Sequence, residues 1–169
     1  MKDKIRKIEK LNKTLESQKE LGGTFLPVGV KEQFDIMFIA EMPSMKTPKI
    51  INQDFNFKVT ARDRFFQEML VKYGVGGSYV TDIVKKRNIP RRPTKEEIKE
   101  WLPFLLKEIE IIDPRAIVVL GKRTYDASFK RNVEPFISQN IKIDYVFHYS
   151  SQVPRSKFEQ RFAEVVDRI

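Results

Sequence analysis

Three polar residues stand at or just before the ends of apolar, strand-like runs of this sequence: Glu41, Asp82 and His148. A carboxylate can stabilise a neighbouring cation and can orient or deprotonate a water molecule, and an imidazole can donate a hydrogen bond to an oxygen that becomes negative. The sequence has one histidine and no cysteine, which excludes thiolate metal sites and leaves little scope for other transition-metal sites. We therefore expect chemistry without a metal ion or other cofactor.

The elements that must position these residues follow an alternating pattern. Four apolar runs are predicted strands, at residues 34–39, 79–84, 116–120 and 142–147, and helices are predicted at residues 62–73, 94–112 and 155–168. This order predicts an α/β fold, a three-layer α/β/α sandwich with a central, mostly parallel four-stranded sheet. Ligands collect at the carboxyl ends of such strands, so the three polar residues are expected to converge there.

The helix after the second strand has clear predicted boundaries. Thr94 followed by Glu97 is a capping-box pattern, and Asp113 before a proline marks the end of the helix. Pro103 removes one backbone hydrogen bond inside it and is expected to kink it. A further amphipathic helix is predicted at about residues 3–20.

The composition bounds the number of domains and the class of partner. A chain of 169 residues with 41% hydrophobic residues can bury one continuous core, so residues 1–169 are predicted to form a single domain, which we expect to be monomeric. The net charge of +9 favours a polyanionic partner, although it is also compatible with a merely solvated basic surface. No apolar run approaches the roughly 18 residues of a membrane span, and no secretory segment is recognisable, which predicts an intracellular protein, cytoplasmic or nuclear.

Five short motifs follow one another along the chain. Residues 40–44 read Ala-Glu-Met-Pro-Ser, Phe57 precedes a helix start, residues 81–85 read Thr-Asp-Ile-Val-Lys, residues 114–121 read Pro-Arg-Ala-Ile-Val-Val-Leu-Gly, and residues 148–150 read His-Tyr-Ser. This order resembles the uracil-DNA glycosylase superfamily, most closely its thermophile-type branch. There the first motif is Gly-Glu-(Ala/Pro)-Pro-Gly, the third Thr-Asn-Val-Val-Lys and the last His-Pro-Ser. The resemblance spans about residues 35–165.

The resemblance implies a monofunctional DNA glycosylase that hydrolyses the bond between deoxyribose and a deaminated base, uracil above all, in base excision repair. Glu41 would stabilise the sugar cation and orient or deprotonate the attacking water. His148 would donate a hydrogen bond to the carbonyl oxygen of the leaving base. The alternative for each is structural: a loop glutamate that pairs with a lysine or arginine, and a histidine that supports the strand end.

Base recognition would fall to a second group of residues. By the resemblance Phe57, or its rival Phe55, would stack on the extruded base, unless both are core residues. Asp82 replaces the expected asparagine. When ionised it can only accept hydrogen bonds, so it would repel uracil O4 and would instead suit an edge with an amino donor, as on cytosine. If burial keeps it protonated, Asp82 could still recognise uracil; alternatively it caps a loop or pairs with Lys85. Ala40 and Met42 complete the predicted base-binding set.

Two segments are predicted to hold DNA. The basic segment at residues 85–92 is expected to contact phosphates, with a solvated loop as the alternative. Residues 150–155 match the superfamily segment that enters the DNA double helix and keeps the base extruded. Gln152 or Val153 would fill the space that the extruded base leaves. The predicted DNA-binding residues are Lys85, Lys86, Arg87, Arg91, Arg92, Ser150, Ser151, Gln152 and Arg155.

Three departures from the branch leave other functions open. The cluster-binding cysteines of that branch are missing, which implies a cluster-free scaffold, while Asp82 and Tyr149 replace its asparagine and its proline. One alternative is therefore a superfamily member that binds DNA without catalysis. Another is an N-glycosidase that acts on free nucleosides or nucleotides.

Overall fold

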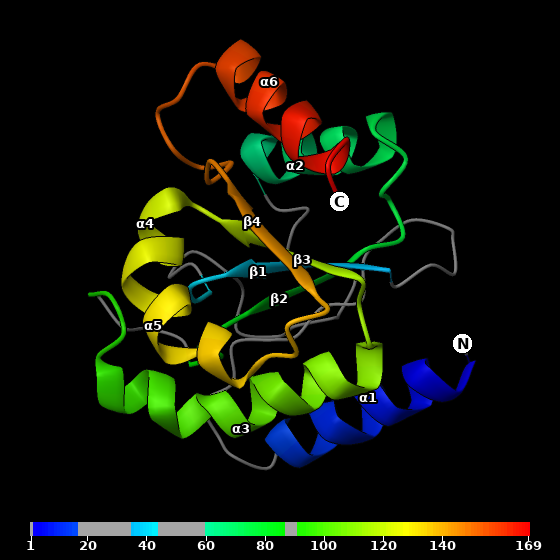
Figure 1. The fold of residues 1–169 in the computed structure, drawn as a ribbon, viewed down its shortest axis with the longest axis vertical. Coiled ribbons are helices and arrows are strands. Elements are labelled where there is room, and N and C mark those ends of the chain that lie inside the picture. Colours follow the sequence, from blue (N-terminus) through cyan, green and yellow to red (C-terminus); the bar gives the residue numbers. More distant parts are fainter. Residues whose placement is uncertain (1, 17–34, 44–59, 87–90) are drawn as a thin grey trace.

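The computed structural model describes residues 2–16, 35–43, 60–86 and 91–169 (Figure 1). Its strands form one parallel sheet in the order β2-β1-β3-β4. Their bounds are β1 (Ile36–Ala40), β2 (Tyr79–Asp82), β3 (Ala116–Leu120) and β4 (Lys142–Val146). The predicted parallel four-stranded sheet is thus confirmed.

Helices cover both faces of this sheet, as Figure 1 shows. On one face lie α2 (Ala61–Lys72) and α6 (Arg155–Val166), and on the other lie α1 (Lys2–Glu16) and α3 (Lys95–Ile112). The predicted three-layer architecture is therefore confirmed. Residues 17–20, the predicted end of the first helix, lie outside the described residues.

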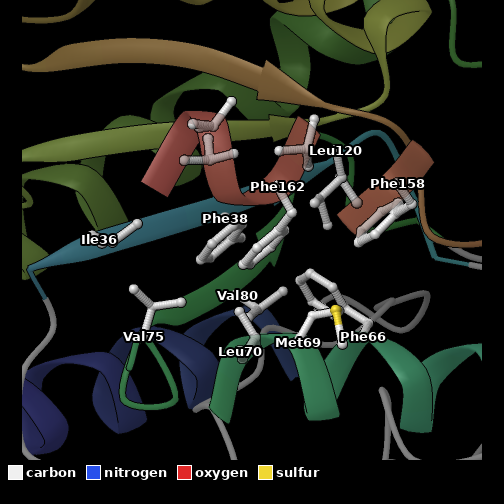
Figure 2. Packing of buried hydrophobic residues seen from close by; sticks show 14 of the residues in the cluster. Ile36, Phe38, Phe66, Met69, Leu70, Val75, Val80, Leu120, Phe158 and Phe162 are labelled. Carbon is white, nitrogen blue, oxygen red and sulfur yellow. The ribbon is translucent and has the colours of Figure 1, made fainter. Parts of the chain in front are cut away.

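The two central strands, β1 and β3, are apolar on both sides because each side of the sheet faces a core there. Along β1, Phe38 points into the cluster beneath α2 and α6, whereas Met37 and Ile39 point into the cluster beneath α1 and α3. In the first cluster the ring of Phe38 stacks on that of Phe162, with centroids 5.8 Å apart, and meets Phe66 edge-on (Figure 2). Two separate cores thus fix the height and register of the strand that precedes Glu41.

Capping boxes define the beginnings of two helices. The Thr94 hydroxyl accepts from the Glu97 N–H at 3.2 Å, and the Glu97 carboxylate accepts from the Thr94 N–H at 2.8 Å, as the sequence pattern predicts. The same exchange between Thr60 and Asp63 begins α2. At the other end of α3, Asp113 adopts a left-handed conformation with φ of 48° and ends the helix.

A helical segment after β3 contains a π-helical turn. It comprises α4 (Lys122–Thr124), the π-helical η1 (Tyr125–Phe129) and α5 (Lys130–Asn132), and a 3-10 turn, η2 (Glu134–Phe136), follows it. Phe129 is fully buried in the cluster shared with α3. π-helical turns are rare and occur often at functional sites.

The order of the strands places a topological switch point between β1 and β3. After β1 the chain passes to β2 on one side, and after β3 it passes to β4 on the other side. Segments that leave the carboxyl ends of β1 and β3 therefore diverge and leave room for a ligand between them. Within the described part of the chain, none of the helices is long and apolar enough to cross a membrane.

Candidate active site

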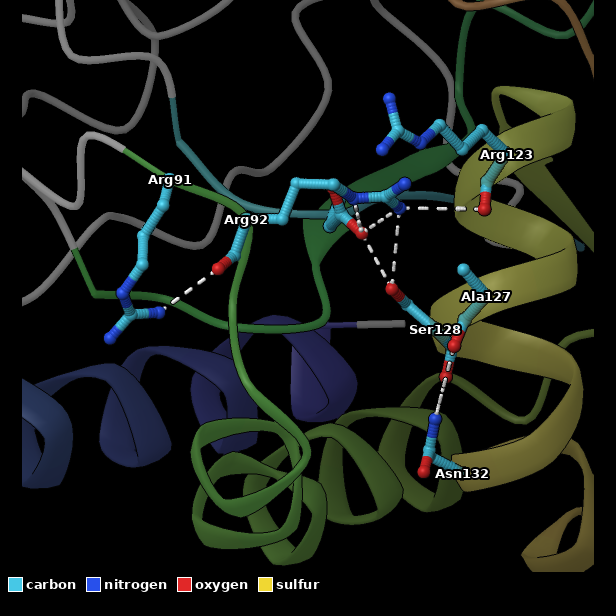
Figure 3. A network of polar contacts seen from close by, with 7 residues as sticks. Arg91, Arg92, Arg123, Ala127, Ser128 and Asn132 are labelled. Atoms are coloured by element: carbon cyan, nitrogen blue, oxygen red, sulfur yellow. Dashed lines mark hydrogen bonds and ion pairs between the residues drawn. The ribbon is translucent and has the colours of Figure 1, made fainter.

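Glu41 follows β1 directly and lies beside the switch point. Its backbone carbonyl accepts from the N–H of Val84 at 3.0 Å, which ties it to the segment after β2. Its carboxylate accepts from Ser128 Oγ at 2.5 Å and from Arg92 Nε at 3.0 Å to each oxygen, and Arg92 Nη2 also donates to Oε1. Figure 3 shows the side chains of Arg92 and Ser128 pointing toward one another in this network. The carboxylate thus accepts hydrogen bonds from the helical segment that follows β3 and from the loop before α3.

His148 lies two residues after β4, and its ring is held by the turn that follows. The backbone N–H of Ser150 donates to Nδ1 at 3.2 Å, and Ser150 Oγ lies 2.7 Å from the same nitrogen. Because a backbone N–H can only donate, Nδ1 must accept, and the proton of the neutral imidazole is then on Nε2. Burial lowers the pKa of His148 to about 4, and the negative charges of Glu41 and Asp63 offset this only in part.

Gly121 brings the end of β3 against His148. Its φ of 107° is one that L side chains rarely adopt, and a Cβ at this position would lie 3.2 Å from Thr124 Oγ1 and 3.5 Å from His148 Cβ. Its N–H donates to the Val146 carbonyl at 2.8 Å. The left-handed backbone and the tight approach to Thr124 therefore favour glycine here, while the distance to His148 is an ordinary van der Waals contact.

Tyr149, which replaces the proline of the resembling branch, has a packing role. Its ring stacks on His148 and on Phe66, with centroid distances of 4.6 Å and 4.9 Å. Burial and a hydrogen bond with the Asp63 carboxylate raise the pKa of Tyr149 well above its ordinary value. The aromatic ring thus supports His148 from the α2 side.

Asp82 is the last residue of β2 and is paired in register with Ala40 of β1. It is almost fully buried, and its Oδ2 has no hydrogen-bond partner within the described residues. Burial raises the pKa of Asp82 to about 7, although the positive charge of Lys85 acts in the opposite direction. The carboxyl group that ends β2 therefore carries its proton below about pH 7.

The prediction that Lys85 contacts phosphate is wrong. Its side chain has no exposed surface and forms a 2.8 Å ion pair with Glu108 of α3, which is equally buried. Nζ also donates to Thr81 Oγ1 at 2.9 Å and to the backbone carbonyl of Asp82 at 2.7 Å. Lys85 thus contacts the backbone of Asp82 and pairs with Glu108, not with the Asp82 carboxylate as the alternative predicted. Tyr79 donates to Glu108 at 3.0 Å and completes the network. A lysine enclosed in this way cannot reach DNA.

Other residues of the basic segment divide between two roles. Arg92 pairs with Glu41, which confirms the alternative of an arginine partner for Glu41, while the predicted contact of Arg92 with phosphate stays a prediction. Arg91 is exposed and pairs with Glu97 at 2.8 Å. Lys86 is partly buried. Arg87 lies outside the described residues, so its predicted role stays a prediction.

The remaining predicted residues are placed as follows. Phe55 and Phe57 lie outside the described residues. Ala40 is buried in the core beneath α2 and α6, and Met42 packs against the opposite core. The Ser150 N–H and hydroxyl face His148, so they support the ring and are not turned toward a ligand. The other predicted residues of that loop are Ser151 and Val153, which are partly buried, and Gln152 and Arg155, which are exposed.

Sequence reasoning missed three contributors to this site: Ser128, Gly121 and Asp63. Ser128 is buried within the π-helical turn, and no pattern of spacing marks it. Gly121 was visible as the glycine that follows an apolar strand. Asp63 lies three residues after Thr60, which is the spacing of a capping box and could have been recognised.

An iron–sulfur cluster, which the resembling branch carries on cysteine thiolates, does not fit this chain. The sequence contains no cysteine, and its single histidine is turned toward Ser150. No ligand set for such a cluster can be assembled from these residues.

Comparison with known proteins agrees with this architecture. The model of the uracil DNA glycosylase superfamily matches residues 27–168, well over half of the chain. A type-4 uracil-DNA glycosylase of Archaeoglobus fulgidus is 30% identical over 101 residues, which cover 58% of this chain and 49% of that protein. One of Pyrobaculum aerophilum is 38% identical over 66 residues, covering 37% and 34%. The matches thus span at most about half the length of these curated relatives.

Proposed function

Because the chain belongs to the uracil DNA glycosylase superfamily, we propose that it is a monofunctional DNA glycosylase that hydrolyses the N-glycosidic bond of a deaminated base. Two curated relatives are named uracil-DNA glycosylases, which makes uracil the first substrate to consider. In this reaction the C–N bond breaks with its electron pair on the base, and a water oxygen bonds to the anomeric carbon. Positive charge therefore grows on the sugar and negative charge on the base.

Glu41 acts on the sugar side of this bond. An ionised carboxylate beside the anomeric carbon stabilises the sugar cation and orients the attacking water, whose proton it can accept. Its position supports this role because it follows β1 at the switch point and is held by the donors of Arg92 and Ser128. These donors keep the carboxylate in one orientation.

His148 acts on the base side. With Nδ1 occupied by Ser150, Nε2–H has no acceptor among the described residues and donates to the carbonyl oxygen of the leaving base, where negative charge develops. The lowered pKa keeps the imidazole neutral at ordinary pH, so it contributes a hydrogen bond and not a full positive charge. By analogy with a single oxyanion donor, its contribution is about 2.7–4 kcal/mol.

Asp82 reads the edge of the base. A protonated carboxyl group offers one donor and one acceptor, the pair that uracil O4 and N3–H require, and so substitutes for an asparagine amide. Its burial supports this role, as does its Oδ2, which has no hydrogen-bond partner in the part of the chain that the structure describes. Phe57, or Phe55, provides the stacking surface.

DNA is held mainly through positive charge. Arg91 and Arg155 are exposed, and with Lys86 and Arg87 they are the proposed phosphate contacts, while Gln152 or Val153 enters the DNA helix in place of the extruded base. The net charge of +9 supports such binding. The protein would then act in base excision repair, in the compartment that holds the DNA.

The observation that carries this proposal is the hydrogen bond from the Ser150 N–H to His148 Nδ1, which leaves Nε2 without a partner among the described residues, within electrostatic reach of Glu41. Purified protein should be incubated with single- and double-stranded oligonucleotides that contain uracil, hypoxanthine or xanthine, followed by alkaline cleavage of abasic sites. We expect strand breaks with at least one base. Breaks no more frequent than with a Glu41→Ala, His148→Ala double variant would overturn the proposal.

A second candidate, a DNA-binding module without catalysis, is favoured by one observation. The Arg92 guanidinium is paired with Glu41 and offsets the charge that the sugar cation needs. This candidate predicts salt-sensitive binding of DNA with no base released from any oligonucleotide of the panel. Turnover on one of them would exclude it.

A further inference from the structure

We propose that Arg92 and Ser128 are positioning residues that fix the carboxylate of Glu41 and leave Oε2 as the oxygen that faces the substrate. This inference rests on the proposed glycosylase function. It assigns Arg92 to the carboxylate and not to a DNA phosphate.

The contacts of the carboxylate are unequal on its two oxygens. Oε1 accepts from Ser128 Oγ at 2.5 Å, from Arg92 Nε at 3.0 Å and from Arg92 Nη2. Oε2 accepts only from Arg92 Nε, at 3.0 Å, within the part of the chain that the structure describes. Since a carboxylate oxygen has two lone pairs, Oε1 is fully used, whereas Oε2 retains capacity for a water molecule or for the charge of the sugar.

Ser128 is itself held in place by the helical segment after β3. It is 4% exposed and lies in the π-helical turn η1, and its carbonyl accepts from Asn132 Nδ2 at 2.8 Å (Figure 3). The hydroxyl has one proton, which it donates to Glu41, and its oxygen lies 3.5 Å from Arg92 Nη2. The wide turn therefore presents a donor across the switch point to the end of β1.

Arg92 joins three parts of the fold at one carboxylate. It stands two residues before Thr94, the N-cap of α3, and its Nη2 also reaches the carbonyl of Arg123 in α4 at 3.4 Å. Its side chain is 30% exposed, and that of Glu41 is 16% exposed. A charge-assisted pair with this degree of shielding holds geometry better than a fully exposed pair does.

Arg91 offers a matched comparison because it carries the same charge next to Arg92 in sequence. It is exposed and pairs with Glu97, away from Glu41. Loss of either arginine removes one positive charge from the same loop. Loss of Arg92 alone removes donors from Glu41.

Single-turnover base excision should therefore be measured for Arg92→Gln, Ser128→Ala and Arg91→Gln, each checked for folding by circular dichroism. We expect kcat to fall about 10–100-fold in the Arg92 and Ser128 variants, with little change in the affinity for DNA. Arg91→Gln should show the opposite pattern: a weaker affinity, and a slope of log affinity against log salt that is reduced by about 0.9. In a Glu41→Gln background, Arg92→Gln should add little further loss, since both act through one carboxylate.

Two results would overturn the inference while leaving the proposed function intact. One is an Arg92→Gln variant that matches Arg91→Gln in affinity and salt slope. The other is a loss of kcat that multiplies in full with the loss caused by Glu41→Gln. Absence of base release by the wild-type protein would instead be a failure of the proposed function.

Discussion

The backbone N–H of Ser150 donates to Nδ1 of His148 at 3.2 Å, and this contact decides which ring nitrogen can face a substrate. The turn after β4 thereby selects the Nε2–H tautomer before any ligand arrives. Tyr149, stacked on the ring at 4.6 Å, limits its rotation. The histidine is thus prepared as a neutral donor.

Removal of the imidazole should slow catalysis without weakening DNA binding. For His148→Ala we expect kcat to fall about 10²–10³-fold, the effect of losing one donor to a developing oxyanion. Single-turnover kinetics at saturating protein measure this directly. A variant within threefold of the wild type would show that the ring has only a structural role.

The pH below which protonation of His148 reduces activity should also be low. The pKa of His148 is lowered to about 4, so the ring stays neutral from about pH 5 upward and gains a proton only below that. We expect no loss of kcat attributable to His148 between about pH 5 and 8. The lowered pKa also affects folding stability. Because the unfolded state takes up the proton near pH 6.5 and the folded state only near pH 4, the free energy of unfolding decreases as pH falls from 6.5 toward 4.

Excision of uracil should weaken as pH rises through about 7. The pKa of Asp82 is raised to about 7, and only the protonated carboxyl can donate to uracil O4. Asp82→Asn supplies a permanent donor and should keep its activity from pH 6 to 9. A wild-type profile that is flat across pH 7, or a variant that keeps the same inflection, would contradict this role for Asp82.

The raised pKa of Asp82 also predicts how folding stability changes with pH, which can be measured without an activity assay. A carboxyl whose folded-state pKa is raised from 3.8 to about 7 resists ionisation, so stability falls as pH rises between these values. The free energy of unfolding of Asp82→Asn should therefore exceed that of the wild type by the largest amount above pH 7. Urea denaturation at pH 5 and pH 8 measures the difference.

Lys85 should matter for stability and not for DNA affinity. Lys85→Met leaves Glu108 buried without its cation, and we expect a loss of about 3–5 kcal/mol in the free energy of unfolding. Lys107→Met, which breaks an exposed pair with Glu110, is the control and should cost less than about 1 kcal/mol. Equal costs for the two variants would contradict the role of Lys85 in the buried pair, and a lower salt slope of DNA binding in Lys85→Met alone would restore it as a phosphate contact.

The sequence predicts the fold well because the strands follow a simple physical rule. Each strand borders two cores, so runs such as residues 116–120 are apolar throughout, and β3 has these bounds. The boundaries of α3 are equally readable because Thr94 and Glu97 satisfy the first backbone groups of the helix. Glu41 and His148 could be identified since both follow such strands.

The rest of the site depends on contacts between residues distant in sequence. Lys85 stands in a basic run that resembles a surface loop, and only the fold brings it beneath Glu108 of α3. Ser128 reaches Glu41 from a π-helical turn, which widens the helix and departs from the regular α-helical spacing that a sequence pattern predicts. Arg92 gives no sequence sign that it faces a carboxylate instead of a phosphate.

The most direct measurement of the central claim is the single-turnover rate at which free uracil leaves a uracil-containing oligonucleotide. The wild type and Glu41→Gln should be compared at pH 6.5, at equal occupancy of the DNA. We predict measurable release by the wild type and a rate about 10²–10⁴-fold lower for Glu41→Gln, with unchanged DNA affinity. Release of uracil by both proteins at the same rate would contradict the assignment of Glu41 as the catalytic carboxylate. If neither protein releases uracil, hypoxanthine or xanthine, the assignment of the protein as a DNA glycosylase is contradicted.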